Sequence, residues 1–253
     1  MEKHKTHFLE WNNRVLQNSF KKIDLSIILV IISDLLFYSS AIFLFTFWFD
    51  RVTVKMSSFN FPNNVGSLGL EIARQLLREE IKFYYLLVFS FIVLLLAIIF
   101  IASILKCIIW AKTTRTKITL GLISKFLMLN LVWMGFWFAL TFLVAYIVQQ
   151  EAVPSFLTAI TIIGLYLTNT LYSVFMKQQS LKSIPYSIKL SISKLHLFFL
   201  PYTVIFLLLF IILQLSRIIA FNYSSIFFGL IAIIYLSIVR YYTSTLVNEI
   251  GKI

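Results

Sequence analysis

The sequence predicts an all-α fold: a polytopic membrane protein with six transmembrane helices arranged as three hairpins, accompanied by amphipathic interfacial helices. The first observation behind this prediction is the composition, because 60% of the 253 residues are hydrophobic and only 13% are charged. Soluble domains contain about 45–50% apolar and about 25% charged residues. One water-soluble domain of this size cannot bury so much Phe, Ile and Leu. The composition therefore excludes a soluble enzyme, a secreted disulfide scaffold and a disordered chain.

The second observation is that the apolar residues form runs long enough to cross a bilayer, whose ~30 Å hydrocarbon core needs about 20 residues of helix. Six such runs follow one another, at Leu25–Phe49, Phe83–Trp110, Leu120–Val148, Val153–Phe175, Leu197–Phe221 and Ser225–Val239. Pro154 falls at the start of the fourth run, and proline suits the first turn of a helix. The runs divide the chain into an interfacial amphipathic helix over 1–24, a transmembrane domain over 25–242 and a short cytoplasmic tail over 243–253.

The third observation is the distribution of the net charge, which totals +12. Both termini and the segments after the second and fourth spans fall on one side of the membrane, where 15 basic and four acidic residues give a net charge of +11. The other side carries six basic and five acidic residues, a net charge of +1. Because short segments rich in Lys and Arg stay in the cytoplasm, we predict a multi-pass protein of the cell membrane with cytoplasmic N- and C-termini. The polar stretch ahead of the first span predicts that this span acts as an uncleaved signal-anchor.

Three basic segments beside the spans have the pattern of interfacial helices. Residues 7–23 place apolar and polar side chains on opposite faces at helical spacing, and the segments 112–125 and 177–194 precede the third and fifth spans. Residues 177–194 also fit the period of a strand, but a lone strand against a bilayer leaves its edges unpaired, so we expect a helix with Pro185 near its first turn. The side chains that we expect to face lipid at the interface are Trp11, Arg14, Lys21, Lys22, Lys182, Lys189 and Lys194.

The basic segments indicate which partners the chain has. Each Lys or Arg near an anionic membrane surface gains about 1 kcal/mol, so the predicted partner is a bilayer with an anionic cytoplasmic leaflet. No zinc-finger, RNA-binding or helix-turn-helix pattern accompanies the charge, and we therefore predict no nucleic-acid partner. We also expect a protein partner or a second copy of the chain.

The first hairpin differs from the other two, because residues 50–82 separate its spans on the outer side. Within this segment, apolar residues at helical spacing run into the second span, and charged residues face away from them. The members of this stripe are Leu70, Ala73, Leu77, Ile81 and Tyr84. We therefore expect the second span to project from the membrane as a long helix.

A few polar residues fall inside the predicted spans, where an ionisable side chain costs about 2.5–3.5 kcal/mol. Asp34 and Lys125 lie at related depth from the same side and suggest a pair in the bundle interior. This pair is either an ion-coupling site or a structural ion pair, unless Lys125 snorkels to the interface and Asp34 is protonated. The polar candidates that could line a pathway, or form interhelical hydrogen bonds, are Asn130, Thr158, Thr161 and Thr168.

Catalytic and metal-binding signatures are missing from the sequence. The histidines His4, His7 and His196 have no metal-ligand spacing, and there is no Walker A or Gly-x-Ser-x-Gly motif. The single cysteine, Cys107, excludes an intramolecular disulfide and is either a small buried hydrophobe or a palmitoylation site. We therefore predict a protein that is not an enzyme, with no catalytic residue, no metal and no cofactor.

The alternation of basic amphipathic segments with pairs of spans, over residues 112–148 and 177–221, resembles six-span membrane domains of archaea and bacteria. The membrane domain attached to some glycerophosphodiester phosphodiesterases is similar. This resemblance implies a membrane domain without catalytic residues, because we expect the soluble phosphodiesterase domain to be absent. The frequent Ile, Phe, Lys and Asn agree with a low-GC prokaryotic genome. The six spans, cytoplasmic termini and interfacial helix over 7–23 also resemble permease subunits of exporter-type ABC transporters, although a distinct coupling-helix motif is missing.

Two functions follow from these observations. The first is a non-enzymatic integral membrane protein that organises the membrane or a complex through lipid- and partner-binding interfacial helices. The alternative is a permease subunit of an ABC-type or ion-coupled transporter that uses Asp34 and Lys125. The substitution Asp34→Asn should leave the first function nearly unchanged and abolish flux under the second.

Overall fold

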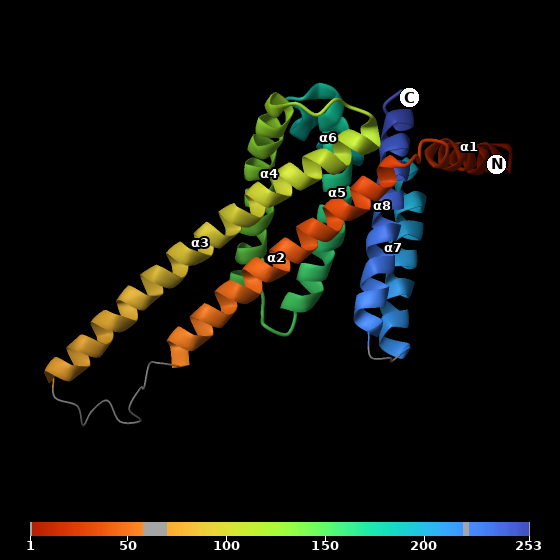
Figure 1. Cartoon of the computed structure of the whole chain (residues 1–253). Coiled ribbons are helices and arrows are strands. Elements are labelled where there is room, and N and C mark those ends of the chain that lie inside the picture. The colour runs from red at the N-terminus through yellow and green to blue at the C-terminus, as the bar shows by residue number, and fades with distance from the viewer. Residues whose placement is uncertain (1, 58–69, 220–222, 253) are drawn as a thin grey trace. The chain divides into compact units, whose positions relative to one another are not determined.

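The computed structural model describes residues 2–57, 70–219 and 223–252, and the side chains of 2–9, 70–73 and 225 lie outside this description. This part of the chain forms eight α-helices and no strand (Figure 1), which confirms the all-α prediction. The helices are α1 (Glu2–Phe20), α2 (Ser26–Ser57), α3 (Leu70–Thr114), α4 (Leu120–Ile147), α5 (Val153–Gln178), α6 (Ser183–Ser193), α7 (Leu195–Ile218) and α8 (Ser224–Ile250). Within the described residues, six of them, all except α1 and α6, are long and apolar enough to cross a membrane. The six-span prediction is confirmed, and the chain is a multi-pass membrane protein.

The chain divides into two compact units. Unit 1 comprises residues 1–35 and 103–253, and unit 2 comprises residues 36–102. Helices α2 and α3 contribute one end to each unit, whereas the remaining helices belong entirely to unit 1.

Unit 1 is a bundle with an aromatic core. Helix α5 packs against α4, α6 and α8, and α7 packs against α8. Large side chains from three helices meet in the core, where the rings of Phe126 and Tyr172 lie 4.9 Å apart and Trp110 contacts Tyr172 edge-on. Cys107 is fully buried in the same cluster, as expected for a small hydrophobe. A second cluster joins α1, α7 and α8 around Val15, Phe198 and Leu246.

Unit 1 has one end at which α1, the α3–α4 connection and α6 lie together (Figure 1). We call it the basic end, because most of the unit's exposed Lys and Arg are on these elements. The opposite end carries the α4–α5 connection, and α5 begins there with Pro154 in its first turn, as predicted.

The α3–α4 connection differs from the prediction. The segment 112–125 is not an interfacial helix, because α3 continues to Thr114 and α4 starts at Leu120, so that only five residues separate two spans. Arg115 adopts a left-handed backbone with φ 58°, and the amide of Thr116 donates to the carbonyl of Ala111 at 2.8 Å, which closes the end of α3 as a Schellman motif. Thr119 then caps α4 by accepting a hydrogen bond from the amide of Leu122 at 3.1 Å. The threefold repeat of an interfacial helix with two spans is therefore wrong in its second member.

Within the segment 177–194, residues Ser183–Ser193 form the short helix α6. This confirms the predicted helix and excludes the strand. Pro185 lies in its first turn, where the missing amide hydrogen costs nothing. Helix α6 turns its serines inward, with Ser183, Ser187 and Ser191 buried against the bundle. The outward face combines exposed apolar and basic residues, as an interfacial helix requires.

Helix α8 is longer than the predicted sixth span, which ended at Val239. The residues assigned to a cytoplasmic tail over 243–253 instead continue the helix to Ile250, and Leu246, Val247 and Ile250 are buried. These side chains pack against α1, which runs across the end of α8 (Figure 1). The hydrophobic cluster beneath α1 accounts for the extension.

Unit 2 contains residues 36–57 of α2 and residues 70–102 of α3. Trp48 links the two helices, because its indole Nε1 donates to Ser90 Oγ at 3.0 Å and its ring lies 5.4 Å from that of Phe91. Helix α3 is continuous for 45 residues, about 68 Å, which confirms the long helix predicted for the second span. Leu70 and Ala73 of the predicted stripe lie in this helix, and their side chains are outside the described part.

Candidate functional site

The most buried ionisable group in the spans of unit 1 is Asp34, which lies eight residues into α2, about 12 Å from its start. Val30, Ser33 and Asp34 are buried on one face of α2, as the spacings of three and four residues dictate. The same spacing places Ser103, Lys106 and Cys107 on one face of α3, and Ser237 and Arg240 on one face of α8. Three helices thus direct polar groups to one point.

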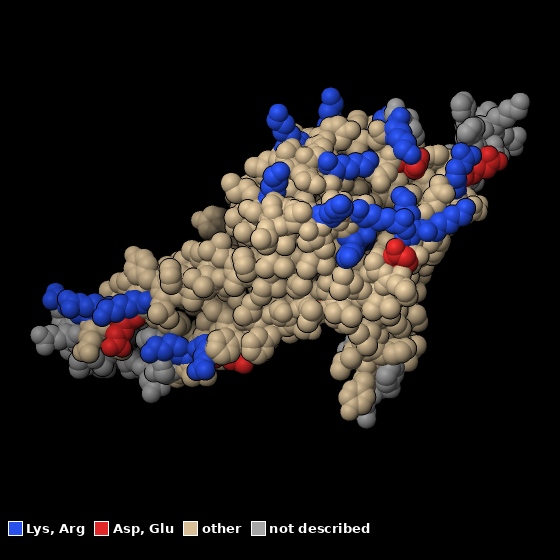
Figure 2. Space-filling model, turned by 45° about the horizontal axis from the view of Figure 1, so that its top comes forward, with Lys and Arg blue, Asp and Glu red and all other residues tan. Residues whose placement is uncertain are grey.

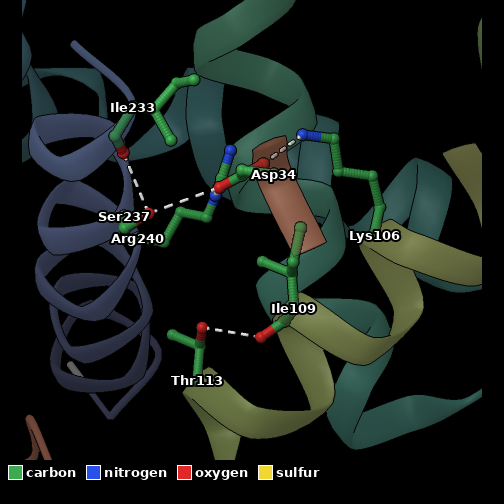
Figure 3. A network of polar contacts seen from close by, with 7 residues as sticks. All are labelled: Asp34, Lys106, Ile109, Thr113, Ile233, Ser237 and Arg240. Carbon is green, nitrogen blue, oxygen red and sulfur yellow. Dashed lines mark hydrogen bonds and ion pairs between the residues drawn. The ribbon is translucent and has the colours of Figure 1, made fainter. Parts of the chain in front are cut away.

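Asp34 forms two ion pairs there (Figure 3). Its Oδ1 accepts from Lys106 Nζ at 2.9 Å, and its Oδ2 accepts from Arg240 Nη1. The hydroxyl of Ser237 donates to the carbonyl of Ile233 at 2.9 Å and lies 3.4 Å from Asp34 Oδ2. The Asp34 side chain is 1% exposed, that of Arg240 8% and that of Lys106 13%.

We call the group formed by Asp34, Lys106 and Arg240 the Asp34 clamp. One carboxylate holds two cations that come from helices 72 and 206 residues away in sequence. Buried ions are tolerated when they are paired and hydrogen-bonded, and removing one member leaves an uncompensated charge. Asp34 therefore ties α2 to α3 and α8.

The suggested pair of Asp34 with Lys125 is wrong. Lys125 is exposed on α4, while Asp34 pairs with Lys106 and Arg240. In the charge distribution along the sequence, both cations count with the cytoplasmic segments. Two signals could have found them: Lys106 lies inside the predicted span Phe83–Trp110, and a sixth span of about 22 Å ending at Val239 is too short for a 30 Å core.

Asn130 belongs to a second polar network, in the core beside the aromatic cluster. Its Nδ2 donates to Ser103 Oγ at 3.0 Å, and its Oδ1 accepts from Tyr172 OH at 2.7 Å, which joins α4 to α3 and α5. Thr168 accepts a hydrogen bond from Trp133 Nε1 at 2.8 Å. Of the two roles predicted for these residues, lining a polar pathway or forming interhelical hydrogen bonds, Asn130 and Thr168 have the second.

Thr158 and Thr161 do not join these networks. Both are exposed, and their hydroxyls donate to carbonyls one turn earlier in α5, at 2.8 Å each. The four polar candidates on α4 and α5 are therefore not brought together into one lining.

The basic end carries most of the residues predicted to face lipid. Figure 2 shows Lys and Arg side chains spread over this end of unit 1, with few acidic residues among them. Arg14 and Lys21 on α1 are exposed, as are Lys182 and Lys189 at α6, and Lys194 is half-buried. Arg14, Lys21, Lys182 and Lys189 are therefore accessible, and their contact with lipid stays a prediction.

Trp11 and Lys22 differ from the prediction, because both are turned toward α8. Trp11 is half-buried against the second hydrophobic cluster, and Lys22 Nζ donates to Thr245 Oγ1 at 3.2 Å. Partial burial lowers the pKa of the Lys22 ammonium group. The buried Val15 and Ser19 on the same face of α1 show why: the helix uses this face to pack against α8.

Comparisons of this chain with protein-family models, with curated proteins and with solved structures find no match. Its function is therefore argued from the residues and their geometry.

Proposed function

We propose that this chain is a non-enzymatic membrane-organising protein whose basic end binds the anionic cytoplasmic leaflet through α1 and α6. The observation that carries the proposal is the set of exposed cations Arg14, Lys21, Lys182 and Lys189 at one end of unit 1. Electrostatic attraction of about 1 kcal/mol for each corresponds to about a fivefold preference for anionic lipid.

The exposed apolar side chains beside these cations support lipid as the partner. Leu16 and Phe20 are 42% and 54% exposed on α1, and Tyr186 and Ile192 are 46% and 68% exposed on α6. A helix that offers apolar and basic groups on its outer surface lies at the boundary between headgroups and acyl chains. In this orientation both termini are cytoplasmic, since α1 and the end of α8 lie at the basic end.

The Asp34 site favours this function over a permease. Both carboxylate oxygens are held by cations, and Lys125, the second residue that the permease hypothesis needs, is exposed. A coupling carboxylate must exchange its proton or ion with a pathway, whereas Asp34 is paired on both sides. We therefore assign the site a structural role and propose a protein partner, or a second copy, for the organising function.

Lipid retention tests the proposal. The protein is purified in a neutral detergent, mixed with equal amounts of phosphatidylglycerol and phosphatidylcholine, and the ratio of retained lipids is measured by native mass spectrometry. The double variant Lys182→Gln/Lys189→Gln should lower the phosphatidylglycerol preference by about fivefold to twentyfold. The matched control is Arg74→Gln/Arg78→Gln in unit 2, which removes the same charge and should leave the ratio unchanged. Equal ratios in both variants would contradict the proposal.

Orientation is tested separately. In a Cys107→Ala background, a cysteine replacing Lys189 should be labelled by an impermeant maleimide only after the cells are opened. Labelling in intact cells would place the basic end outside.

A further inference from the structure

A pocket lies at the basic end, between the start of α2, the end of α3 and the α3–α4 connection. Its volume is about 410 Å³. The residues that line it are Asp24, Ser26, Ala111, Lys112, Arg115, Thr116, Lys117 and Ile118. The lining residues thus include three basic residues, one acidic residue and two that carry hydroxyl groups.

The backbone of Arg115 is the feature that sets this pocket apart. Its φ of 58° is at the C′ position of a Schellman motif, which is usually glycine, because a side chain there is strained. An arginine at such a strained position suggests that its side chain has a use. The left-handed turn places the guanidinium beside the pocket, where Nη2 lies 3.6 Å from Asp24 Oδ2 and donates to the Lys22 carbonyl at 3.4 Å.

These contacts orient the guanidinium without using all of it. Arginine has five N–H donors, and one nitrogen makes both long contacts. Asp24 is engaged elsewhere, since its Oδ1 accepts hydrogen bonds from the amide and the hydroxyl of Ser26. Lys112 and Lys117 form no ion pair with any described residue. The pocket therefore has an excess of positive charge and free donors.

We propose that this pocket binds a phosphate group, with Arg115 as the main donor and Lys112 and Lys117 as the flanking cations. Arg and Lys are the residues that bind phosphate through charge-assisted hydrogen bonds. The source of the phosphate is the headgroup of an anionic phospholipid, because exposed apolar side chains flank the pocket. Leu25 and Leu120 are 85% and 86% exposed, at the starts of two spans, and would contact the acyl chains. The inference deepens the proposed function and rests on it for the orientation in the membrane.

Thermal unfolding in a neutral detergent, followed by tryptophan fluorescence, tests the pocket. The probes are dioctanoyl-phosphatidylglycerol, dioctanoyl-phosphatidylcholine and inorganic phosphate. Phosphatidylglycerol should raise the unfolding temperature saturably, and Arg115→Gln should weaken its apparent Kd at least tenfold, as expected for the loss of a charge-assisted hydrogen bond. Lys82→Gln in unit 2 is the control of equal charge and should bind like the unchanged protein.

A second variant separates binding from folding. Arg115→Gly relieves the backbone strain, so it should raise the unfolding temperature without lipid and still lose the response to phosphatidylglycerol. Unchanged binding in both Arg115 variants overturns the site. A shift of equal size with inorganic phosphate overturns the lipid assignment, and one with phosphatidylcholine overturns the need for net negative charge.

The outcome is distinguishable from that of the proposed function. Loss of lipid preference in Lys182→Gln/Lys189→Gln with intact binding in Arg115→Gln would retain the function and remove the pocket. The opposite pattern would retain the pocket and remove α6 from the lipid surface.

Discussion

Units 1 and 2 differ in the contacts that hold their apolar helices together in a bilayer. Unit 1 buries ion pairs and hydrogen bonds between helices: the Asp34 clamp and the Asn130 network each join three of them. In unit 2, the described contacts between α2 and α3 include one side-chain hydrogen bond, Trp48 to Ser90, and a ring contact. Because lipid is as apolar as Leu, helices in a membrane gain little from burying Leu. Polar contacts therefore specify how the helices of unit 1 pack, whereas in unit 2 Trp48 combines a polar and an aromatic contact between α2 and α3.

The largest expected effect is at Asp34. Asp34→Asn keeps the shape of the side chain and removes the negative charge that pairs with Lys106 and Arg240, so the free energy of unfolding in mixed micelles should fall by about 3–5 kcal/mol. This replaces the expectation that a non-transporting protein would tolerate the substitution. The control is Asp50→Asn on the exposed surface of unit 2, expected within about 0.5 kcal/mol. Equal losses would show that the clamp adds nothing.

The Asn130 network should come next. Asn130→Leu removes the acceptor of the buried Tyr172 hydroxyl in the core, which costs about 1–3 kcal/mol in the same unfolding assay. Thr161→Val removes an exposed hydroxyl that bonds only within its own helix and should change stability by less than about 0.5 kcal/mol. If Asn130→Leu were neutral, the contrast between the units would rest on the clamp alone.

At the strained turn of Arg115, a substitution should raise the free energy of unfolding instead of lowering it. Arg115→Gly should raise the free energy of unfolding in lipid-free detergent by about 1 kcal/mol, because glycine adopts a positive φ without strain. Gln179, with φ 49° at the end of α5, is the matched position, and Gln179→Gly should stabilise by a similar amount. A loss of stability at Arg115 alone would mean that its contacts outweigh the strain.

Unit 2 should respond weakly to the loss of its hydrogen bond. Trp48→Phe removes the indole donor and should cost about 0.6 kcal/mol, the average for such bonds in membrane proteins. Ser90→Ala should cost about the same, and the double variant should cost no more than either, as measured in a double-mutant cycle. A cost comparable to that of Asn130→Leu would remove the proposed difference between the units.

The smallest effect is expected for Asp24 as pH falls. Hydrogen bonds from the hydroxyl and the amide of Ser26 hold the pKa of this exposed carboxyl below its ordinary value. A carboxyl whose pKa is lower in the folded state contributes stability above its unfolded pKa, and this contribution is lost as pH falls through the folded value. The difference in unfolding temperature between the unchanged protein and Asp24→Asn should therefore be present at pH 6 and shrink as pH falls below about 4. A difference of the same size at pH 6 and at pH 2 would contradict this assignment.

The spans were predictable because a bilayer imposes length and apolarity on every helix that crosses it, and both are visible in sequence. The helices α1 and α6 were predictable from their periodicity. The partners of Asp34 were missed because a linear count treats Lys106 and Arg240 as flanking charges, although both lie two turns or more from the ends of their helices. The replacement of an interfacial helix over 112–125 by a five-residue connection depends on the left-handed turn at Arg115, which the hydrophobic periodicity does not reveal. The inward side of α1 depends on the position of α8, which the sequence pattern of α1 does not contain.

The Asp34 clamp also constrains how the protein is made. Asp34 enters the membrane with the first span, 72 residues before Lys106 and 206 residues before Arg240 are synthesised. At about 5–20 residues per second, the carboxyl waits about 4–14 s for its first cation and about 10–40 s for its second. During that interval it must be kept neutral by a proton or be sheltered by the insertion machinery. The sixth span completes the clamp, so a chain truncated before Arg240 carries a half-paired charge.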